Sequence, residues 1–96
     1  MVPTEEGGRR SPAFSGYRPS HDFGRSDGLN DAQHEYPDDD LLHPGETGRA
    51  LLRLLAPDLQ HGRLFEGMTF TVQEGSRIVG YGMVTRIHNE ALRRAV

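Results

Sequence analysis

Histidine and carboxylate side chains are the groups in this sequence that could bind a metal ion or act as acid and base. The five histidines are His21, His34, His43, His61 and His88. No two of them lie three or four residues apart, the spacing that brings two metal ligands together on one helix face. His21 and Asp22 are adjacent, so on a strand their side chains would point to opposite faces. The spacing therefore predicts histidines in loops or on the surface, and no metal site.

The run Asp38-Asp39-Asp40 is the densest group of carboxylates, and it follows Pro37. Calcium loops need oxygen ligands at spaced positions and a glycine at the turn, whereas consecutive aspartates splay apart. A solvated turn is therefore expected. A hydrolase of the Ser/His/Asp type needs a nucleophile on a constrained turn beside oxyanion donors, and no such motif occurs. We expect a protein that is not an enzyme and has no cofactor.

Arginine supplies every cationic side chain: the chain has eleven arginines, no lysine and fourteen acidic residues, for a net charge of −3. This balance argues against a broad basic field for nucleic acid. Arginine could have been selected for planar contacts to phosphate. Because lysine is absent from the whole chain and not only from one region, a coding bias is the favoured explanation for the use of arginine. The phosphate loop of GTPases requires a lysine, so GTP hydrolysis is excluded and no nucleotide partner is expected.

Composition also bears on compartment and size. Ninety-six residues correspond to about one small domain. Without cysteine there is no disulfide, thiol nucleophile or cysteine-based metal site, and the cytoplasm is the expected location. The longest apolar run, residues 50–56, is interrupted by Arg53 and falls far short of the roughly 18 residues of a membrane span. Residues 1–6 do not resemble a secretory signal. No membrane association is expected.

The second half of the chain carries the clearer structural pattern, whereas residues 1–47 are polar and proline-rich, as in loops and short strands. Met68, Phe70 and Val72 alternate with polar residues, which predicts a half-buried strand. Residues 74–76 form a turn, and residues 77–87 are rich in β-branched and aromatic residues. The two glycines at positions 80 and 82 indicate a bend or a close backbone approach. A β-hairpin is predicted.

Two further segments are short. Residues 48–56 fit a helix by propensity and a strand by alternation, and a short apolar run does not decide between them. Residues 89–96 form a tail in which Asn89 is a good helix N-cap, with an acid early and arginines late, as the helix dipole favours. Such a helix is too short to be stable unless it docks.

Three motifs, in the same order, resemble the third, C-terminal domain of bacterial elongation factor Tu. Residues 5–19, Glu-Glu-Gly-Gly-Arg-Arg-Ser-Pro-Ala-Phe-Ser-Gly-Tyr-Arg-Pro, resemble its opening turn and strand. Pro44-Gly45-Glu46 is similar to its Pro-Gly-acid turn, and residues 74–84 are similar to its closing hairpin. The resemblance covers about residues 5–87.

The resemblance implies an all-β fold, a six-stranded antiparallel barrel over residues 1–88 followed by the tail 89–96. It also implies that residues 48–56 form a strand with Leu51 and Leu55 on the outer face. These leucines would then be an interaction surface or be covered by the tail. Only Met1–Thr4 remains for the family's first strand, so we expect this strand to be short or missing. An open edge of that kind invites pairing with another chain.

The family's third domain meets the T-stem of aminoacyl-tRNA, mostly through the sugar–phosphate backbone, and also contacts protein partners. Carried over by position, Arg9, Tyr17, Glu74 and Gly75 match its RNA-contacting turn and strand residues. These types of residue also occur simply because turns and half-buried strands need them. Three further contacts of the family are replaced here, by Ser20, Leu29 and Ala56, which predicts weaker and less salt-dependent RNA binding.

Two functions follow as hypotheses. The first is a non-catalytic module of translation elongation that contacts tRNA, or a protein of the elongation cycle, through Arg9, Tyr17, Glu74 and Gly75. The second is a protein–protein interaction or oligomerisation module unrelated to translation, which acts through the open edge or through Leu51 and Leu55.

Overall fold

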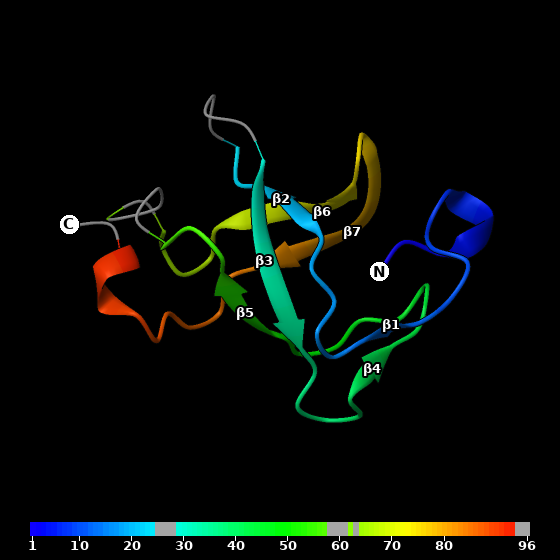
Figure 1. The fold of residues 1–96 in the computed structure, drawn as a ribbon, viewed down its shortest axis with the longest axis horizontal. Helices are drawn as coiled ribbons and strands as arrows, with labels where there is room; N and C mark the ends of the chain where they lie inside the picture. Colours follow the sequence, from blue (N-terminus) through cyan, green and yellow to red (C-terminus); the bar gives the residue numbers. More distant parts are fainter. Residues whose placement is uncertain (25–28, 58–61, 63, 94–96) are drawn as a thin grey trace.

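The computed structural model describes residues 1–24, 29–57, 62 and 64–93, and within these residues the fold is all-β (Figure 1). Two 3-10 turns, η1 (Thr4–Glu6) and η3 (Glu90–Leu92), lie near the ends. The strands are β1 (Ala13–Phe14), β2 (Ser20–Asp22), β3 (Asn30–Glu35), β4 (Leu41–Leu42), β5 (Leu51–Leu54), β6 (Thr69–Glu74) and β7 (Arg77–Met83).

The strands form two antiparallel sheets. One contains β1 and β4, and the other has five strands in the order β5-β3-β2-β6-β7. The backbone before β2 also joins the larger sheet, because the Gly16 amide donates to the His34 carbonyl and the His34 amide donates to the Tyr17 carbonyl. The chain therefore bends from the small sheet into the large one between β1 and β2.

The closed six-stranded barrel is not observed, since no ladder joins β5 to β7 among the residues described. The N-terminal segment explains part of this difference. The Val2 amide donates to the Val79 carbonyl at the edge of β7, but Pro3 has no amide hydrogen and η1 begins at Thr4. No first strand forms at this edge, and the large sheet stays open.

The β6–β7 hairpin confirms the hairpin predicted from residues 67–87, but its second strand ends at Met83 instead of residue 87 and its connection is tighter than expected. Glu74 pairs with Arg77, so only Gly75 and Ser76 connect the strands. Phe70 pairs with Gly82, and a Cβ atom at Gly82 would lie 2.3 Å from the Phe70 ring. The alternate glycines therefore allow the close approach that the sequence indicated.

The leucine-rich segment is a strand, shorter than residues 48–56. β5 pairs with β3 through Arg53 opposite Gln33 and Leu51 opposite Glu35. Leu52 and Leu54 are half-buried, whereas Leu51 and Leu55 are exposed, so the alternation of the sequence is confirmed. Pairing with β3 decides against the helix that propensity favoured.

The interior has an apolar part and a polar part. The apolar part contains Phe23, Leu64, Met68 and Ile87. The tail closes this part: the Leu64 amide donates to the Leu92 carbonyl, and Leu92 packs against the cluster. The expected C-terminal helix is a single 3-10 turn in which the Asn89 side chain accepts from the Ala91 amide, at 3.1 Å. Residues 94–96 lie outside the described part of the chain.

Candidate functional site

Three of the four residues singled out for RNA contact converge on one carboxylate. Arg9 follows η1, Tyr17 precedes β2 and Glu74 ends β6. Glu74 Oε2 accepts hydrogen bonds from Arg9 Nη1 and from the Tyr17 hydroxyl. The Arg9 guanidinium carbon also lies 4.6 Å from the centre of the Tyr17 ring, within the range of a cation–π contact. We call Arg9, Tyr17 and Glu74 the Arg9 cluster.

Arg9 is held on several sides. Its Nε donates to the Ser11 carbonyl at 3.2 Å, and its Nη2 is 3.4 Å from the Pro12 carbonyl. With Nη1 bound to Glu74, each nitrogen of the guanidinium group has a partner within the protein. Arg9 therefore acts first as a clamp between the N-terminal turn and the β6–β7 hairpin.

The cluster has a fixed ionisation state at neutral pH. Burial, followed by the hydrogen bond to Glu74, raises the pKa of Tyr17 well above its usual range. Burial alone would raise the pKa of Glu74, but hydrogen bonds from Tyr17 and Arg9 outweigh it and lower that pKa. Tyr17 is thus a neutral donor to an ionised Glu74.

Gly75 lies beside the cluster, at the exposed tip of the hairpin. Its φ of +62° is in the left-handed region that favours glycine, and a Cβ atom there would meet nothing within 4 Å. The turn leaves this backbone open to a ligand. Gly75, the fourth residue that the resemblance singled out, therefore lies next to the Arg9 cluster.

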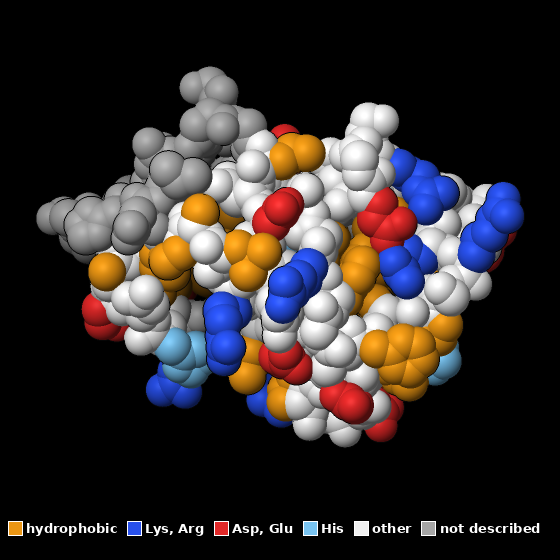
Figure 2. All heavy atoms as spheres, in the orientation of Figure 1, with side chains coloured by type: hydrophobic (Ala, Val, Ile, Leu, Met, Phe, Trp, Pro, Cys, Tyr) orange, Lys and Arg blue, Asp and Glu red, His pale blue; other side chains and the backbone are white. Residues whose placement is uncertain are grey.

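The sequence hypothesis did not include two further exposed cations, Arg77 beside Glu74 and Arg10 next to Arg9 in the chain. Arg77 donates to Glu74 Oε1 at 3.3 Å, and its side chain remains 53% exposed. Arg10 is exposed next to Arg9. Their positions in the sequence could have identified them, because Arg10 follows Arg9 and Arg77 lies two residues after Gly75. Acidic and cationic side chains are mixed over the face in Figure 2, so the site is local rather than part of a broad field.

Leu51 begins the edge strand β5 and Leu55 directly follows its end, apart from the Arg9 cluster, and the two leucines are 50% and 49% exposed. The described part of the tail docks elsewhere, on Gly62 and Leu64, and positions 51 and 55 remain exposed. The sequence left open two alternatives for the leucines at these positions, an interaction surface or cover by the C-terminal tail. The part of the tail that the structure describes, which ends at Arg93, does not cover them.

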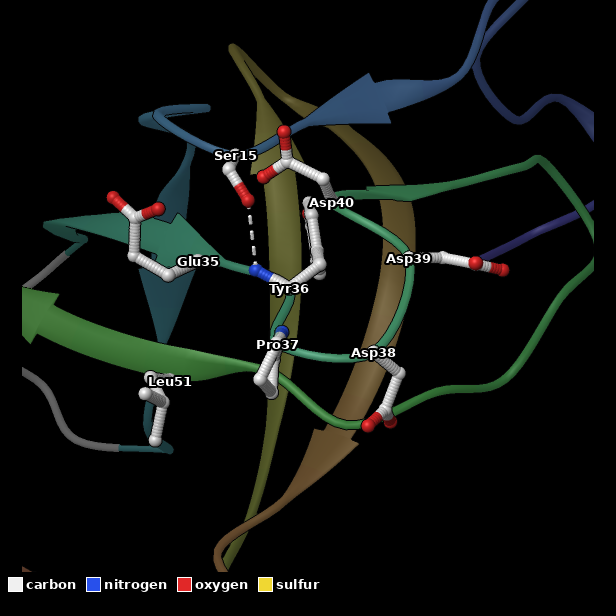
Figure 3. Close-up of a pocket in the computed structure, with 8 residues that line it drawn as sticks. All are labelled: Ser15, Glu35, Tyr36, Pro37, Asp38, Asp39, Asp40 and Leu51. Atoms are coloured by element: carbon white, nitrogen blue, oxygen red, sulfur yellow. Dashed lines mark hydrogen bonds between the residues drawn. The ribbon is translucent and has the colours of Figure 1, made fainter.

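An acidic groove of about 530 Å³ begins beside Leu51 (Figure 3). The turn after β3 forms most of it, as expected for the aspartate run. Asp38 is paired with Arg49 at 2.7 Å, and the Asp40 amide donates to the Tyr36 carbonyl. The groove is lined by Ser15, Glu35, Tyr36, Pro37, Asp38, Asp39, Asp40 and Leu51.

The prediction of surface histidines is wrong for His21 and His34, which are 0% and 4% exposed. Their Nε2 atoms are 2.7 Å apart. His34 and Tyr36 occupy alternate positions and face the interior with Ala32. This spacing of two residues is the sequence signal that could have indicated their burial. His43 and His88 are exposed as expected, and His61 lies outside the described residues.

The hydrogen bonds fix where the protons lie in this buried chain. The Asn30 carbonyl accepts only, so His21 Nδ1 donates to it at 3.1 Å, and His21 Nε2 accepts. His34 Nε2 then donates to His21. His34 Nδ1 accepts from the Tyr36 hydroxyl at 2.9 Å. This pattern requires two neutral imidazoles, the state that their burial favours, and each ring nitrogen has a partner.

Burial and the neighbouring imidazole lower the pKa of His34 to about 3, and burial lowers that of His21. Burial raises the pKa of Tyr36 to about 12. The Tyr17 ring meets His34 edge-on, with centroids 5.5 Å apart. His34 thus packs against the Tyr17 ring and links the buried histidine pair to the Arg9 cluster.

Within residues 1–24, 29–57, 62 and 64–93, no three histidine or acidic side chains are grouped so that they could hold a metal ion. In the same residues, no helix is long and apolar enough to cross a membrane. No protein-family model matches the sequence. What the Arg9 cluster offers chemically is a rigid support for exposed guanidinium groups, which suits binding.

Proposed function

We propose that this protein is a non-catalytic binding module similar to the third domain of elongation factor Tu, and that its Arg9 cluster and hairpin tip contact the sugar–phosphate backbone of tRNA. The observation that carries the proposal is the convergence of Arg9 and Tyr17 on Glu74. These residues are 65 and 57 positions from Glu74 in the chain. The resemblance singled them out separately, and they form one surface feature.

The roles within the site follow from the hydrogen bonds. The Tyr17 hydroxyl and Arg9 Nη1 donate to Glu74, and the other nitrogens of Arg9 donate to nearby groups of the N-terminal segment, so Arg9 and Tyr17 hold the hairpin tip in place. Arg77 and Arg10 remain exposed and supply charge to a phosphate group, and the turn at Gly75 lets the backbone approach it. Contacts of this kind position RNA without reading its bases.

The closed barrel that the resemblance implies is not part of this proposal. The binding face needs only the β6–β7 hairpin and the segments that carry Arg9 and Tyr17, and the hydrogen bonds to Glu74 hold these together although the sheet is open. A protein of the elongation cycle that presents acidic side chains is the other partner to which this face is suited.

A filter-binding titration with aminoacyl-tRNA over a salt series tests the proposal. We expect binding at about 50 mM salt that weakens as salt rises. Arg77→Ala and Arg10→Ala should each weaken binding several-fold and lower the slope of log K against log salt by roughly 0.7 to 0.9.

The matched control is Arg49→Ala, which removes an exposed arginine beside the acidic groove and should leave both affinity and slope unchanged. Absence of binding at low salt would exclude tRNA as the partner. Equal losses in all three variants would show a non-specific charge effect and would contradict the assigned site.

A further inference from the structure

The outer edge of β5 has free backbone groups. Directly after β5, the Leu55 amide donates to the Asp31 carbonyl at 3.1 Å, and within β5 the register places Arg53 opposite Gln33. Residues 51, 53 and 55 therefore use their backbone groups toward β3. Successive residues of a strand direct these groups to opposite sides, so those of Leu52 and Leu54 point away from the sheet. Within the described chain, no strand pairs with this side of β5.

The other edge of the sheet is different. At β7, the Val79 carbonyl accepts from the Val2 amide, so the N-terminal segment covers part of that edge. Unpaired edges template pairing with another chain unless charge, proline or a covering segment protects them. β5 has a single charged residue, Arg53, and no proline. It is the less protected of the two edges.

The sequence of this edge reads the same in both directions. Residues 50–56 are Ala-Leu-Leu-Arg-Leu-Leu-Ala, a palindrome centred on Arg53. If two copies of β5 run antiparallel about this centre, Leu52 of one copy lies opposite Leu54 of the other. These are the residues whose free backbone groups point outward, so the palindromic register also satisfies the hydrogen-bond alternation.

The side chains fit the same register. On the outer face, Leu51 of one copy lies opposite Leu55 of the other, and each would cover a leucine that is half exposed in the single chain. Arg53 would lie opposite Arg53 of the second copy, which alone is unfavourable. Since Arg53 pairs with Gln33, the carboxylates of Asp31 and Glu35 are its diagonal neighbours on the same face, and they offset this repulsion.

We propose that β5 is a self-association edge, at which two copies of this chain pair antiparallel about Arg53 and join their five-stranded sheets into one. The edge shares no residue with the Arg9 cluster, so the inference does not depend on RNA binding. A contact limited to one short strand buries less than a stable interface needs. The dimer is therefore weak and reversible.

Sedimentation velocity over protein concentrations from about 10 µM to about 1 mM tests self-association. The average mass should rise toward that of a dimer. The double variant Leu51→Lys/Leu55→Lys should remain monomeric over this range, because four ammonium groups would meet at the interface. Both positions are half exposed, so the far-UV circular dichroism spectrum should be unchanged.

The matched control is Tyr81→Lys/Met83→Lys. It places the same two charges on exposed apolar positions of β7 and should associate like the unmodified chain. A chain that stays monomeric throughout would overturn the proposal. Equal loss of association in both double variants would also contradict it, because the effect would then come from charge alone.

A cysteine at the centre tests the register itself. Opposed residues of a non-hydrogen-bonded antiparallel pair have Cα atoms about 4.5 Å apart, within the range that a disulfide spans. The chain has no other cysteine. Arg53→Cys should therefore form a covalent dimer under mild oxidation much faster than Gln33→Cys, its neighbour on β3. Likewise, Leu51→Cys should cross-link faster with Leu55→Cys than with itself. Equal rates in these comparisons would show association through another surface.

Discussion

At the scale of single residues, Glu74 is the acceptor on which the candidate site depends. Its carboxylate accepts from Arg9, Tyr17 and Arg77, which reach it from the N-terminal turn, the segment before β2 and the start of β7. Hydrogen bonds to an ionised group contribute more than those between neutral groups. Partial exposure of the site limits their net contribution to stability.

Glu74→Gln should lower the free energy of unfolding by about 1 to 2 kcal/mol, because the amide accepts more weakly and turns a donor toward Arg9. Urea denaturation at pH 7 measures this. Glu5→Gln, an exposed acid in η1, is the control and should change stability by less than about 0.5 kcal/mol. Equal small effects of the two substitutions would mean that the Arg9 cluster contributes nothing to the fold.

The buried histidine pair makes stability depend on pH. His34 has a pKa of about 3 in the folded chain, and that of His21 is also lowered, whereas both groups titrate near 6.5 when unfolded. Between these values the unfolded state binds more protons. The stabilisation is complete above about pH 6.5 and is lost as the pH falls toward 3, by up to about 1.4 kcal/mol per pH unit for each histidine.

Urea midpoints measured from pH 7.5 to pH 5 should therefore fall steeply. The double variant His21→Phe/His34→Phe should show a much smaller slope over this range, whatever its absolute stability. His43→Phe/His88→Phe changes two exposed histidines and should keep the slope of the unmodified chain. A slope that survives loss of His21 and His34 would place the titrating groups elsewhere.

At the scale of elements, the β6–β7 hairpin links the site to the interior. Its tip carries Glu74 and Gly75, while Phe70 lies over Gly82 at the far end and contacts Phe23, with ring centroids 5.6 Å apart. A side chain at position 82 would therefore displace an aromatic ring of the core.

Gly82→Ala should destabilise the fold by about 1 to 3 kcal/mol, because its methyl group would overlap the Phe70 ring. A double-mutant cycle with Phe70→Leu measures the coupling. The cost of Gly82→Ala should fall clearly when Phe70 is leucine. An identical cost in both backgrounds would show that the ring is not the obstacle.

Elements formed by local patterns were predictable from the sequence, and those formed by distant pairing were less so. Alternation in residues 68–72 and the glycines at 80 and 82 indicated the hairpin, and Asn89 indicated a helix N-cap in the tail, where it caps a single 3-10 turn. Propensity favoured a helix around Leu52, where pairing with β3 makes a strand. The closed barrel that the resemblance implied is not observed in the part of the chain that the structure describes. Closure depends on which sheet edges meet, and Pro3 interrupts pairing on β7.

At the scale of the whole molecule, the candidate site arises from contacts between segments far apart in the chain. The resemblance singled out Arg9, Tyr17 and Glu74, but no local pattern shows that one carboxylate joins them. Burial of His34 depends in the same way on the segment Gly16–Tyr17, which pairs with β3. Separation in the sequence hides such contacts, and the open edge of β5 is visible only in the folded sheet.

The most direct test of the central claim is a map of backbone amide chemical shifts during titration with aminoacyl-tRNA. We expect the largest changes at Arg10, Gly75, Ser76 and Arg77, with smaller changes at Arg9 and Tyr17, because those two are held within the protein. Arg77→Ala should remove most of them at the same RNA concentration. Changes confined to Leu51–Leu55, or no changes at about 50 mM salt, would contradict the account.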